Sequence, residues 1–366
     1  MGAGDDGMER AYWLAWSAVE GVGAAGIKQL LDHFGSLGAA WRASPAALSE
    51  VLYWSGQRAE LVAPRRDRLD PASVLAHCEA RWPPFWTPAD PGYPPLLAEI
   101  ADPPPVLFAE GSLAGKPWPP AVAIVGTRRP SPHGLAWAAR LAAALARTGF
   151  VVVSGLAYGI DAAAHHHALE AGGATVAVLG GSTREIYPAL HRPLAARARA
   201  CGALISEHPP GTRIESHHFP KRNRILVGVC RATIVVEAPE RSGALISAQL
   251  ACEYGRDVYV LPASPDLPEA RGCLKLLAQG ASPILSLEEL LVALQGTPLP
   301  SRRSEAPPTF EVGEEPVWEC LRGVALGFDE MVERTGLSST DLATALLTLE
   351  MKGVLTRHPD GRYALA

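Results

Sequence analysis

Short apolar runs alternate with alanine-rich segments of helical length from residue 121 to about residue 294. The runs are Ala121–Val125, Phe150–Val153, Thr175–Leu179, Ala203–Ile205, Ile225–Gly228, Thr233–Val236 and Asp257–Leu261. Strands that are apolar on both faces lie inside parallel sheets, because crossover helices cover each face. The pattern therefore predicts an α/β fold with an extended Rossmann-like core and a mostly parallel sheet.

The flanking sequence differs from this core in its pattern. Apolar residues at helical spacing fill the N-terminal part, and prolines punctuate residues 82–120. A polar, proline-rich stretch of the kind that forms extended linkers precedes the C-terminal part. We therefore expect a helical SAM-like module over 1–81, the core with its proline-rich entry over 82–295, a linker over 296–316 and a winged helix over 317–366.

A Gly-Val-Gly turn at Gly21–Gly23 precedes a segment with Ile27, Leu30 and Leu31 at helical spacing. The combination resembles a helix-hairpin-helix or SAM-like module. Its backbone amides can form a nest that holds a phosphate. A plain helical packing domain explains the same residues, and the sequence favours this second interpretation.

The C-terminal segment has the pattern of a helix-turn-helix with a wing. We expect short helices at Val317–Leu321 and Phe328–Arg334, a longer helix at Ser339–Lys352, and a hairpin over 354–364 with its turn at Pro359–Gly361. A helix that recognises base edges presents Arg, Asn or Gln to them. The longer helix instead offers Thr340, Asp341, Thr344, Thr348 and Glu350. This favours packing or a protein contact over the reading of duplex DNA.

The loop after the first core strand, Gly126–Gly134, combines small residues with Arg128 and Arg129. Ligands of open parallel sheets bind at the carboxyl ends of the strands. Backbone amides and the N-terminus of the next helix favour an anion there, and arginines clamp phosphates bidentately. The sequence therefore predicts an anion site, with a connecting loop of solvated arginines as the alternative.

Two further loops, at Ser154-Gly155 and Ser242-Gly243, offer amides and hydroxyl groups at the starts of helices. Neither contains the glycine pattern of a dinucleotide fold or a Walker A loop, so the sequence supports neither a nicotinamide cofactor nor ATP hydrolysis. Asp161 is better explained as a cap of the helix that carries His165 than as its partner on a metal, which needs more ligands. We expect no cofactor and no metal.

A basic segment, Phe219–Leu226, contains Lys221, Arg222, Asn223 and Arg224 beside an aromatic ring. Charge this dense is costly to bury unpaired, so we expect the segment to face an anion. Cations for phosphates and an aromatic ring for bases are typical of sites for single-stranded nucleic acid. The alternative is the first turn of a helix with surface arginines.

The overall charge of −5 excludes a protein coated in basic surface, so any nucleic-acid contact is expected to be local. The six cysteines are scattered without a paired spacing, which predicts reduced thiols rather than zinc or a redox motif. The N-terminus lacks the apolar core of a signal peptide, and no apolar run has membrane-spanning length. These features predict a soluble, cytoplasmic protein with no membrane partner.

No catalytic set is evident. Ser154, Asp161 and His165 come closest, but their spacing supplies no plausible nucleophile, base and orienting group. A nucleotide or nucleotide-sugar hydrolase of a Rossmann type also uses glycine-rich turns, and this enzyme class is the alternative function. It typically carries a Pro-Gly-Gly-x-Gly-Thr run, which is absent from this sequence.

Together these segments resemble the DNA-processing protein A family, also named Smf. The resemblance is carried by Val125–Arg128, Ser154–Asp161, Ala177–Gly180, Tyr187-Pro188, Ser206-Glu207, Phe219–Ile225, Val235–Ala238, Ser242–Leu245 and Gly255-Arg256. It is strong over residues 90–295, and the flanking helical and winged-helix segments agree with the family layout.

The resemblance implies a recombination mediator that binds and protects single-stranded DNA and loads RecA on it during transformation, rather than an enzyme. It implies phosphate contacts at Arg128 and at the basic patch of Lys221, Arg222 and Arg224, with Asn223 within the patch and Phe219 near the bases. From the residues themselves, Arg129, Ser154, Gly155, Ser242 and Gly243 complete the expected DNA-binding set. The resemblance also implies a homodimer formed near Cys273–Ala281.

Overall fold

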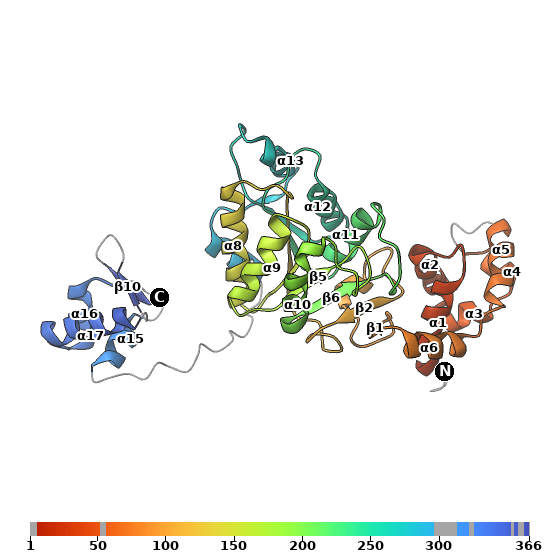
Figure 1. Cartoon of the computed structure of the whole chain (residues 1–366), viewed down its shortest axis with the longest axis horizontal. Coiled ribbons are helices and arrows are strands. Elements are labelled where there is room, and N and C mark those ends of the chain that lie inside the picture. The colour runs from red at the N-terminus through yellow and green to blue at the C-terminus, as the bar shows by residue number, and fades with distance from the viewer. Residues whose placement is uncertain are drawn as a thin grey trace. The chain divides into compact units, whose positions relative to one another are not determined.

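The computed structural model describes residues 6–51, 56–295, 313–321, 326–352, 355–357 and 362–365. The chain folds as two compact units, Met1–Pro300 and Ser301–Ala366 (Figure 1). Most of the expected linker, residues 296–312, lies outside the described residues.

The N-terminal part of the first unit is helical, as its apolar spacing predicts. Its helices are α1 (Asp6–Ala18), α2 (Ala24–Phe34), α3 (Leu37–Arg42), α4 (Pro45–Leu48), α5 (Gly56–Arg66) and α6 (Pro71–Arg81). Trp16, Ile27 and Leu30 lie fully buried in their common core. Asp70 accepts a hydrogen bond from the Ser73 amide and so caps α6, which carries the chain towards the sheet.

The rest of the first unit is built on one sheet. Its strands are β1 (Phe85–Trp86), β2 (Leu107–Glu110), β3 (Ala121–Val125), β4 (Val151–Ser154), β5 (Thr175–Val178), β6 (Ala203–Ser206), β7 (Ala232–Val235), β8 (Asp257–Val260) and β9 (Ser282–Pro283). They lie in the order β1-β2-β6-β5-β4-β3-β7-β8-β9. The strands from β3 to β9 are parallel, whereas β1 and β2 pair antiparallel at one edge. The predicted mostly parallel, Rossmann-like sheet is therefore confirmed.

Helices cover both faces of this sheet. They are α7 (Pro95–Ala98), α8 (Pro132–Arg147), α9 (Ile160–Glu170), α10 (Arg192–Cys201), α11 (His218–Gly228), α12 (Gly243–Glu253), α13 (Arg271–Ala278) and α14 (Leu287–Gln295), with 3-10 turns η1 (Ala189–His191) and η2 (Pro268–Ala270). The helices α8, α9 and α14 share one apolar cluster with the sheet, and α11, α12 and α13 share the other. Figure 1 shows α8 and α9 side by side.

The run Ile225–Gly228 is apolar like the strands, but it forms the second half of α11. Ile225, Leu226 and Val227 pack on the sheet instead of extending it. A short apolar run can form either a buried strand or part of a buried helix, and its sequence alone does not distinguish the two. Here the helix begins in the basic residues before the run and continues through it.

The strand order places β3 between β4 and β7, where the chain reverses the direction in which strands are added. Ligands of doubly wound sheets bind in the crevice outside the carboxyl ends of the strands at this point. The loops after β3, β4 and β7 meet there, and these are the loops that the sequence predicts as anion sites.

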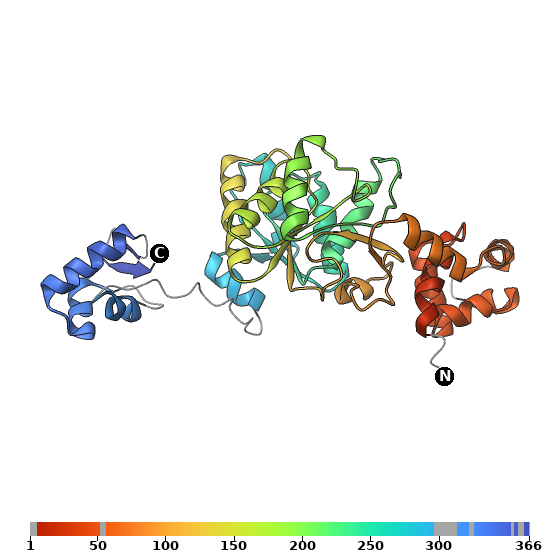
Figure 2. The ribbon, with the colours of Figure 1, turned by 60° about the horizontal axis from the view of Figure 1, so that its bottom comes forward.

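The second unit is a winged helix, blue in Figures 1 and 2. Its elements are α15 (Glu314–Cys320), α16 (Phe328–Thr335), α17 (Ser339–Met351), β10 (Leu355–Arg357) and β11 (Tyr363–Leu365). The strands pair antiparallel, and Val317, Met331 and Leu342 lie in the apolar core. The expected hairpin turn at Pro359–Gly361 lies outside the described residues. Within the described ranges, no helix is long and apolar enough to cross a membrane.

The helix α8 offers a matched test of the core. Leu141 is fully buried against the sheet, whereas Leu135 on the same helix is 41% exposed. We expect Leu141→Ala to lower the free energy of unfolding by about 2–5 kcal/mol, because it leaves a cavity. Leu135→Ala is expected to change it by less than about 0.5 kcal/mol. Urea denaturation followed by circular dichroism measures both, and equal losses would contradict the assignment of this face.

Candidate nucleic-acid interface

The loops at the carboxyl ends of the strands are in direct contact. The Ile160 amide at the start of α9 donates to the Thr127 carbonyl, and the Thr127 amide donates to the Glu237 carbonyl after β7. A Cβ on Gly159 would lie 2.4 Å from the Thr127 oxygen, so this close approach requires glycine. The loops after β3, β4 and β7 therefore form one continuous surface.

The Ser131 amide of the first loop already binds an anion, and that anion is a carboxylate of the protein itself. The carboxylate of Glu237, which is 4% exposed, accepts from the Ser131 amide at 2.9 Å and from the Ser131 hydroxyl at 3.3 Å. Ser131 in turn caps α8 by accepting from the Gly134 amide. The predicted phosphate position at this helix N-terminus is thus occupied by Glu237, where the helix dipole stabilises its negative charge.

The second loop is filled in the same way. The Asp161 carboxylate accepts from the Gly155 amide at 3.1 Å and from the Ala157 amide at 3.3 Å. Asp161 is 7% exposed, and burial raises the pKa of its carboxyl group. The Arg222 guanidinium opposes that rise in pKa and favours the ionised form. Gly155 therefore serves an internal carboxylate. The expected helix cap is wrong, because Gly159 is the N-cap of α9 and Asp161 lies in its first turn, where it binds amides of the preceding loop.

Arg222 lies inside the protein, under this surface, and connects the ends of two strands. Its side chain is buried and donates to the carbonyl of Gly155, at 3.0 Å, and to the carbonyl of Val178 at the end of β5. Burial lowers the pKa of the guanidinium to about 10, so it stays charged at neutral pH. Arg222 joins α11, the β4 loop and β5 through these contacts.

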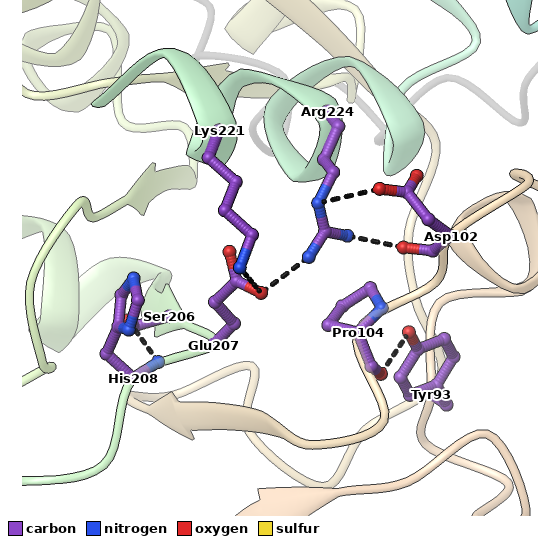
Figure 3. Close-up of polar contacts among 8 residues, drawn as sticks. All are labelled: Tyr93, Asp102, Pro104, Ser206, Glu207, His208, Lys221 and Arg224. Carbon is purple, nitrogen blue, oxygen red and sulfur yellow. Dashed lines mark hydrogen bonds and ion pairs between the residues drawn. The ribbon is translucent and has the colours of Figure 1, made fainter. Parts of the chain in front are cut away.

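Arg224 forms a second buried ion cluster on the same helix (Figure 3). Its guanidinium donates to Glu207 at 2.5 Å and to the carbonyl of Asp102 at 2.6 Å, and its Nε lies 3.3 Å from the Asp102 carboxylate. Lys221 extends from α11 to the same Glu207, at 3.6 Å. The side chain of Arg224 is 5% exposed and that of Lys221 is 55% exposed, so the two cations differ in what they offer to a ligand.

Asn223 and the third loop complete the contacts. The Asn223 side-chain amide donates to the Gly243 carbonyl at 3.3 Å, which ties α11 to the start of α12. Ser242 caps α12 by accepting from the Ala244 amide. Gly243 itself is exposed, with open space where a Cβ would lie. Ser154 is fully buried, and its hydroxyl donates to the Ile124 carbonyl at 2.6 Å.

The structure corrects the expected orientation of the basic segment. Arg222, Asn223 and Arg224 point into the protein, where carbonyl and carboxylate groups satisfy them, because the segment lies inside α11 rather than in an open loop. Lys221, by contrast, is exposed, as are Arg128 and Arg129 after β3. These exposed cations are the members of the predicted set whose charge faces solvent.

Aromatic rings lie on the helix that carries Lys221 and in the neighbouring loops. Phe219, partly exposed at the start of α11, packs over Gly180 and lies 5.5 Å from the ring of Tyr187, which is 55% exposed. Tyr158, 44% exposed in the β4 loop, lies 4.9 Å from His191. Tyr158 and Tyr187 were not among the predicted site residues, since nothing in the sequence distinguishes an exposed tyrosine from a buried one.

The candidate catalytic residues are satisfied by contacts inside the protein. His165 is buried, and its Nδ1 lies 2.6 Å from the Thr175 hydroxyl. That hydroxyl donates to the Val152 carbonyl, so it accepts from His165. Burial lowers the pKa of His165 to about 3, which keeps the ring neutral. Among the described residues, no group of His, Cys, Asp and Glu is arranged to hold a metal ion.

The fold and the site define an extended Rossmann-type protein whose strand-end surface carries exposed cations and aromatic rings, followed by a winged helix. Residues 84–295 match the family model for DNA recombination-mediator protein A, and residues 300–361 match that for the DprA winged helix domain. The chain belongs to the DNA-processing protein A family, also named Smf.

Relatives and solved structures agree with this assignment. The chain is 40% identical to Protein Smf of Synechocystis sp. over 97% of its own length and 98% of the relative's. It is similar to the structure of DNA processing protein A from Streptococcus pneumoniae, with a TM-score of 0.65, 32% identity, and coverage of 78% of this chain and 97% of that one.

A second solved structure adds information on a ligand. It is described as "Structural insights into the unique single-stranded DNA binding mode of DNA processing protein A from Helicobacter pylori". The TM-score is 0.53 and the identity 30%, over 58% of this chain and 96% of that one.

The two cations that share Glu207 give a matched test of the buried cluster. We expect Arg224→Ala to lower the free energy of unfolding by about 3–5 kcal/mol, since it leaves buried carboxylates without their partner. Lys221→Ala removes an exposed cation from the same carboxylate and is expected to cost less than about 1 kcal/mol. Urea denaturation of both variants measures the difference. A stable Arg224→Ala protein would show that Arg224 is free for another role.

Proposed function

We propose that this protein is a recombination mediator that binds single-stranded DNA across the carboxyl ends of the parallel strands. The observation that carries the proposal is the grouping of exposed cations, Arg128, Arg129 and Lys221, with the partly exposed rings of Phe219 and Tyr187. Membership of the DNA-processing protein A family supports it. So does the similarity to the Helicobacter pylori structure, whose description names single-stranded DNA binding.

The exposed and the buried residues have different roles in this proposal. Arg128, Arg129 and Lys221 contact phosphates, and bases stack near Phe219 and Tyr187, each stack contributing roughly 1–3 kcal/mol. Arg222, Asn223 and Arg224 position this surface through the carbonyls and carboxylates that they bind. Gly243 is exposed at the start of α12, where the absence of a side chain leaves room for the backbone of the DNA strand beside Ser242. Ser154 and Gly155 do not contact DNA in this proposal, and they fix the conformation of the β4 loop from inside the protein.

The nucleotide-hydrolase alternative is less well supported. A nucleotide bound at this point of a Rossmann-type sheet places its phosphates on the backbone amides of the loops. Here Glu237 and Asp161 occupy amides in the loops after β3 and β4. An internal carboxylate repels a phosphate from the same position. Side chains are then left as the main phosphate contacts, which suits a DNA strand that lies across an open surface.

We also propose partners and a cellular location for the protein. The protein protects single-stranded DNA in the cytoplasm and promotes the loading of RecA on it, in transformation or recombination. It acts as a homodimer and not as an enzyme. Support for the dimer comes from two exposed apolar residues: Leu285, directly after the edge strand β9, is 72% exposed, and Leu267, just before η2 and α13, is 39% exposed. This edge lies next to α13, in the region implied by the family resemblance.

Binding of single-stranded DNA is tested by titrating a labelled oligonucleotide at several salt concentrations. We expect Arg128→Ala and Lys221→Ala each to weaken binding and to flatten the slope of log K against log salt by about 0.7, because each removes one phosphate contact. Arg147, exposed at the other end of α8, is the matched control, and its replacement by alanine leaves the slope unchanged. Unchanged affinity and slope in both test variants would refute this site.

Dimer formation is tested by sedimentation velocity of the full chain. We expect Leu285→Arg to shift the protein to monomer, because a charge in an apolar interface loses its hydration without gaining a partner. Leu61→Arg is the control, since Leu61 is 57% exposed on α5, in the N-terminal module. A dimer that survives Leu285→Arg, or a wild-type monomer, would place the assembly elsewhere or exclude it.

A further inference from the structure

A cavity of about 780 Å³ lies between the N-terminal helices and the core, within the first compact unit. Val22 and Gly23 of the Gly-Val-Gly turn and Arg68 line one side, and Phe108, Glu207 and Lys221 line the other. Small-molecule sites are typically clefts of roughly 300–1,000 Å³ with apolar walls and a few polar groups. The cavity has the size and the composition of such a site.

We propose that this cavity is a nucleotide-binding site, which takes one base, sugar and phosphate unit of the bound DNA strand. The proposal rests on the proposed function and deepens it, because it assigns part of the strand to the N-terminal module. Lys221 links the two places, since it belongs to the exposed cations of the strand-end surface and also lines the cavity.

The walls of the cavity suit a flat ring. Val74 from the helical module contributes partly exposed aliphatic surface, whereas Leu14 and Val106 in the same wall are buried. The ring of Trp82 is also partly exposed, and it packs edge-to-face on the buried ring of Phe108 with ring centres 5.2 Å apart. Bases stack on aromatic and apolar side chains without strong sequence preference.

The charged part of the cavity suits a phosphate. Gly23 caps the 11-residue helix α2 without any side-chain hydrogen bond, and the space where its Cβ would lie is open. Arg68 is exposed and forms no ion pair with another described residue. The cavity lining holds two cations, Arg68 and Lys221, and two carboxylates, Asp70 and Glu207. A phosphate is therefore expected beside the cations and the amides of the helix start.

The carboxylate of Glu207 gives the cavity a polar group that can make it selective among bases. Its side chain is 10% exposed, and while one carboxylate oxygen binds Arg224, the other is buried without a hydrogen-bond partner. A carboxylate accepts from the amino group of cytosine or adenine, whereas thymine has no such group. The site is therefore expected to favour an amino-bearing base.

The test uses the full chain and fills the cavity with a side chain. Ala18 is exposed at the end of α1 and lines the cavity, so Ala18→Trp blocks it. Ala80→Trp, at an exposed position of α6 outside the cavity lining, is the matched control. We expect Ala18→Trp to weaken binding of oligo-deoxycytidine roughly 5- to 150-fold, the loss of one stacked base, and binding of oligo-deoxythymidine by less.

A second variant tests the phosphate contact and does not depend on packing. Arg68→Ala is expected to flatten the salt slope for oligo-deoxycytidine by about 0.7, while Arg81→Ala, another exposed arginine of the same module, leaves it unchanged. Free deoxycytidine monophosphate, titrated calorimetrically, distinguishes the two sources of a nucleotide. Monophosphate binding that Ala18→Trp abolishes, with oligonucleotide binding intact, would assign the cavity to free nucleotides and overturn the contact with the strand.

The outcomes separate this inference from the proposed function. If Arg128→Ala and Lys221→Ala weaken DNA binding but Ala18→Trp and Arg68→Ala change neither DNA nor monophosphate binding, the inference is overturned and the proposed function stands. If the wild-type protein binds no oligonucleotide, the proposed function fails, and the contact of the cavity with a strand fails with it.

Discussion

The buried guanidinium of Arg222 holds the functional surface in place. It binds the carbonyl oxygens of Gly155 and Val178, and the nearby Asp161 carboxylate favours its charge. A cation in this position is stable only while those acceptors stay in place, because a buried charge without partners is strongly destabilising. The β4 loop, the end of β5 and the helix α11 are thus fixed by one side chain, and the positions of Lys221 and Phe219 follow from the position of that helix.

Internal carboxylates determine what kind of ligand this Rossmann-type sheet accepts. Glu237 and Asp161 satisfy amides that a nucleotide phosphate uses in dinucleotide-binding relatives of the fold. The remaining attraction for phosphate comes from exposed side chains such as Arg128 and Lys221. Cations on an open surface suit a polymer whose successive phosphates pass over them, whereas a small ligand is held better by amides in an enclosed site.

The strands of the sheet were predictable from the sequence because each depends on a short apolar run of neighbouring residues. The run Ala121–Val125 is apolar at every position, which a buried parallel strand requires, and it forms β3 with the same bounds. The meeting of the loops at one edge follows from the parallel direction of the strands. The direction of the basic side chains was not predictable in this way. Arg224 is buried because Asp102, 122 residues away, meets it, and no local pattern records that partner.

The same buried pairs explain how an acidic chain can present a local surface for an anion. Arg222 and Arg224 are neutralised by Asp161, Glu207 and Asp102, so they add little to the field outside the protein. The exposed cations produce that field instead, and at physiological ionic strength charges more than about 8 Å away are largely screened. The net charge of −5 therefore does not oppose binding at this edge, provided that the acidic residues lie elsewhere or beneath the surface. Glu237 and Asp161 meet that condition because they are buried against the amides that they bind, and the carboxylate of Glu207, 10% exposed, is paired with Arg224 and Lys221.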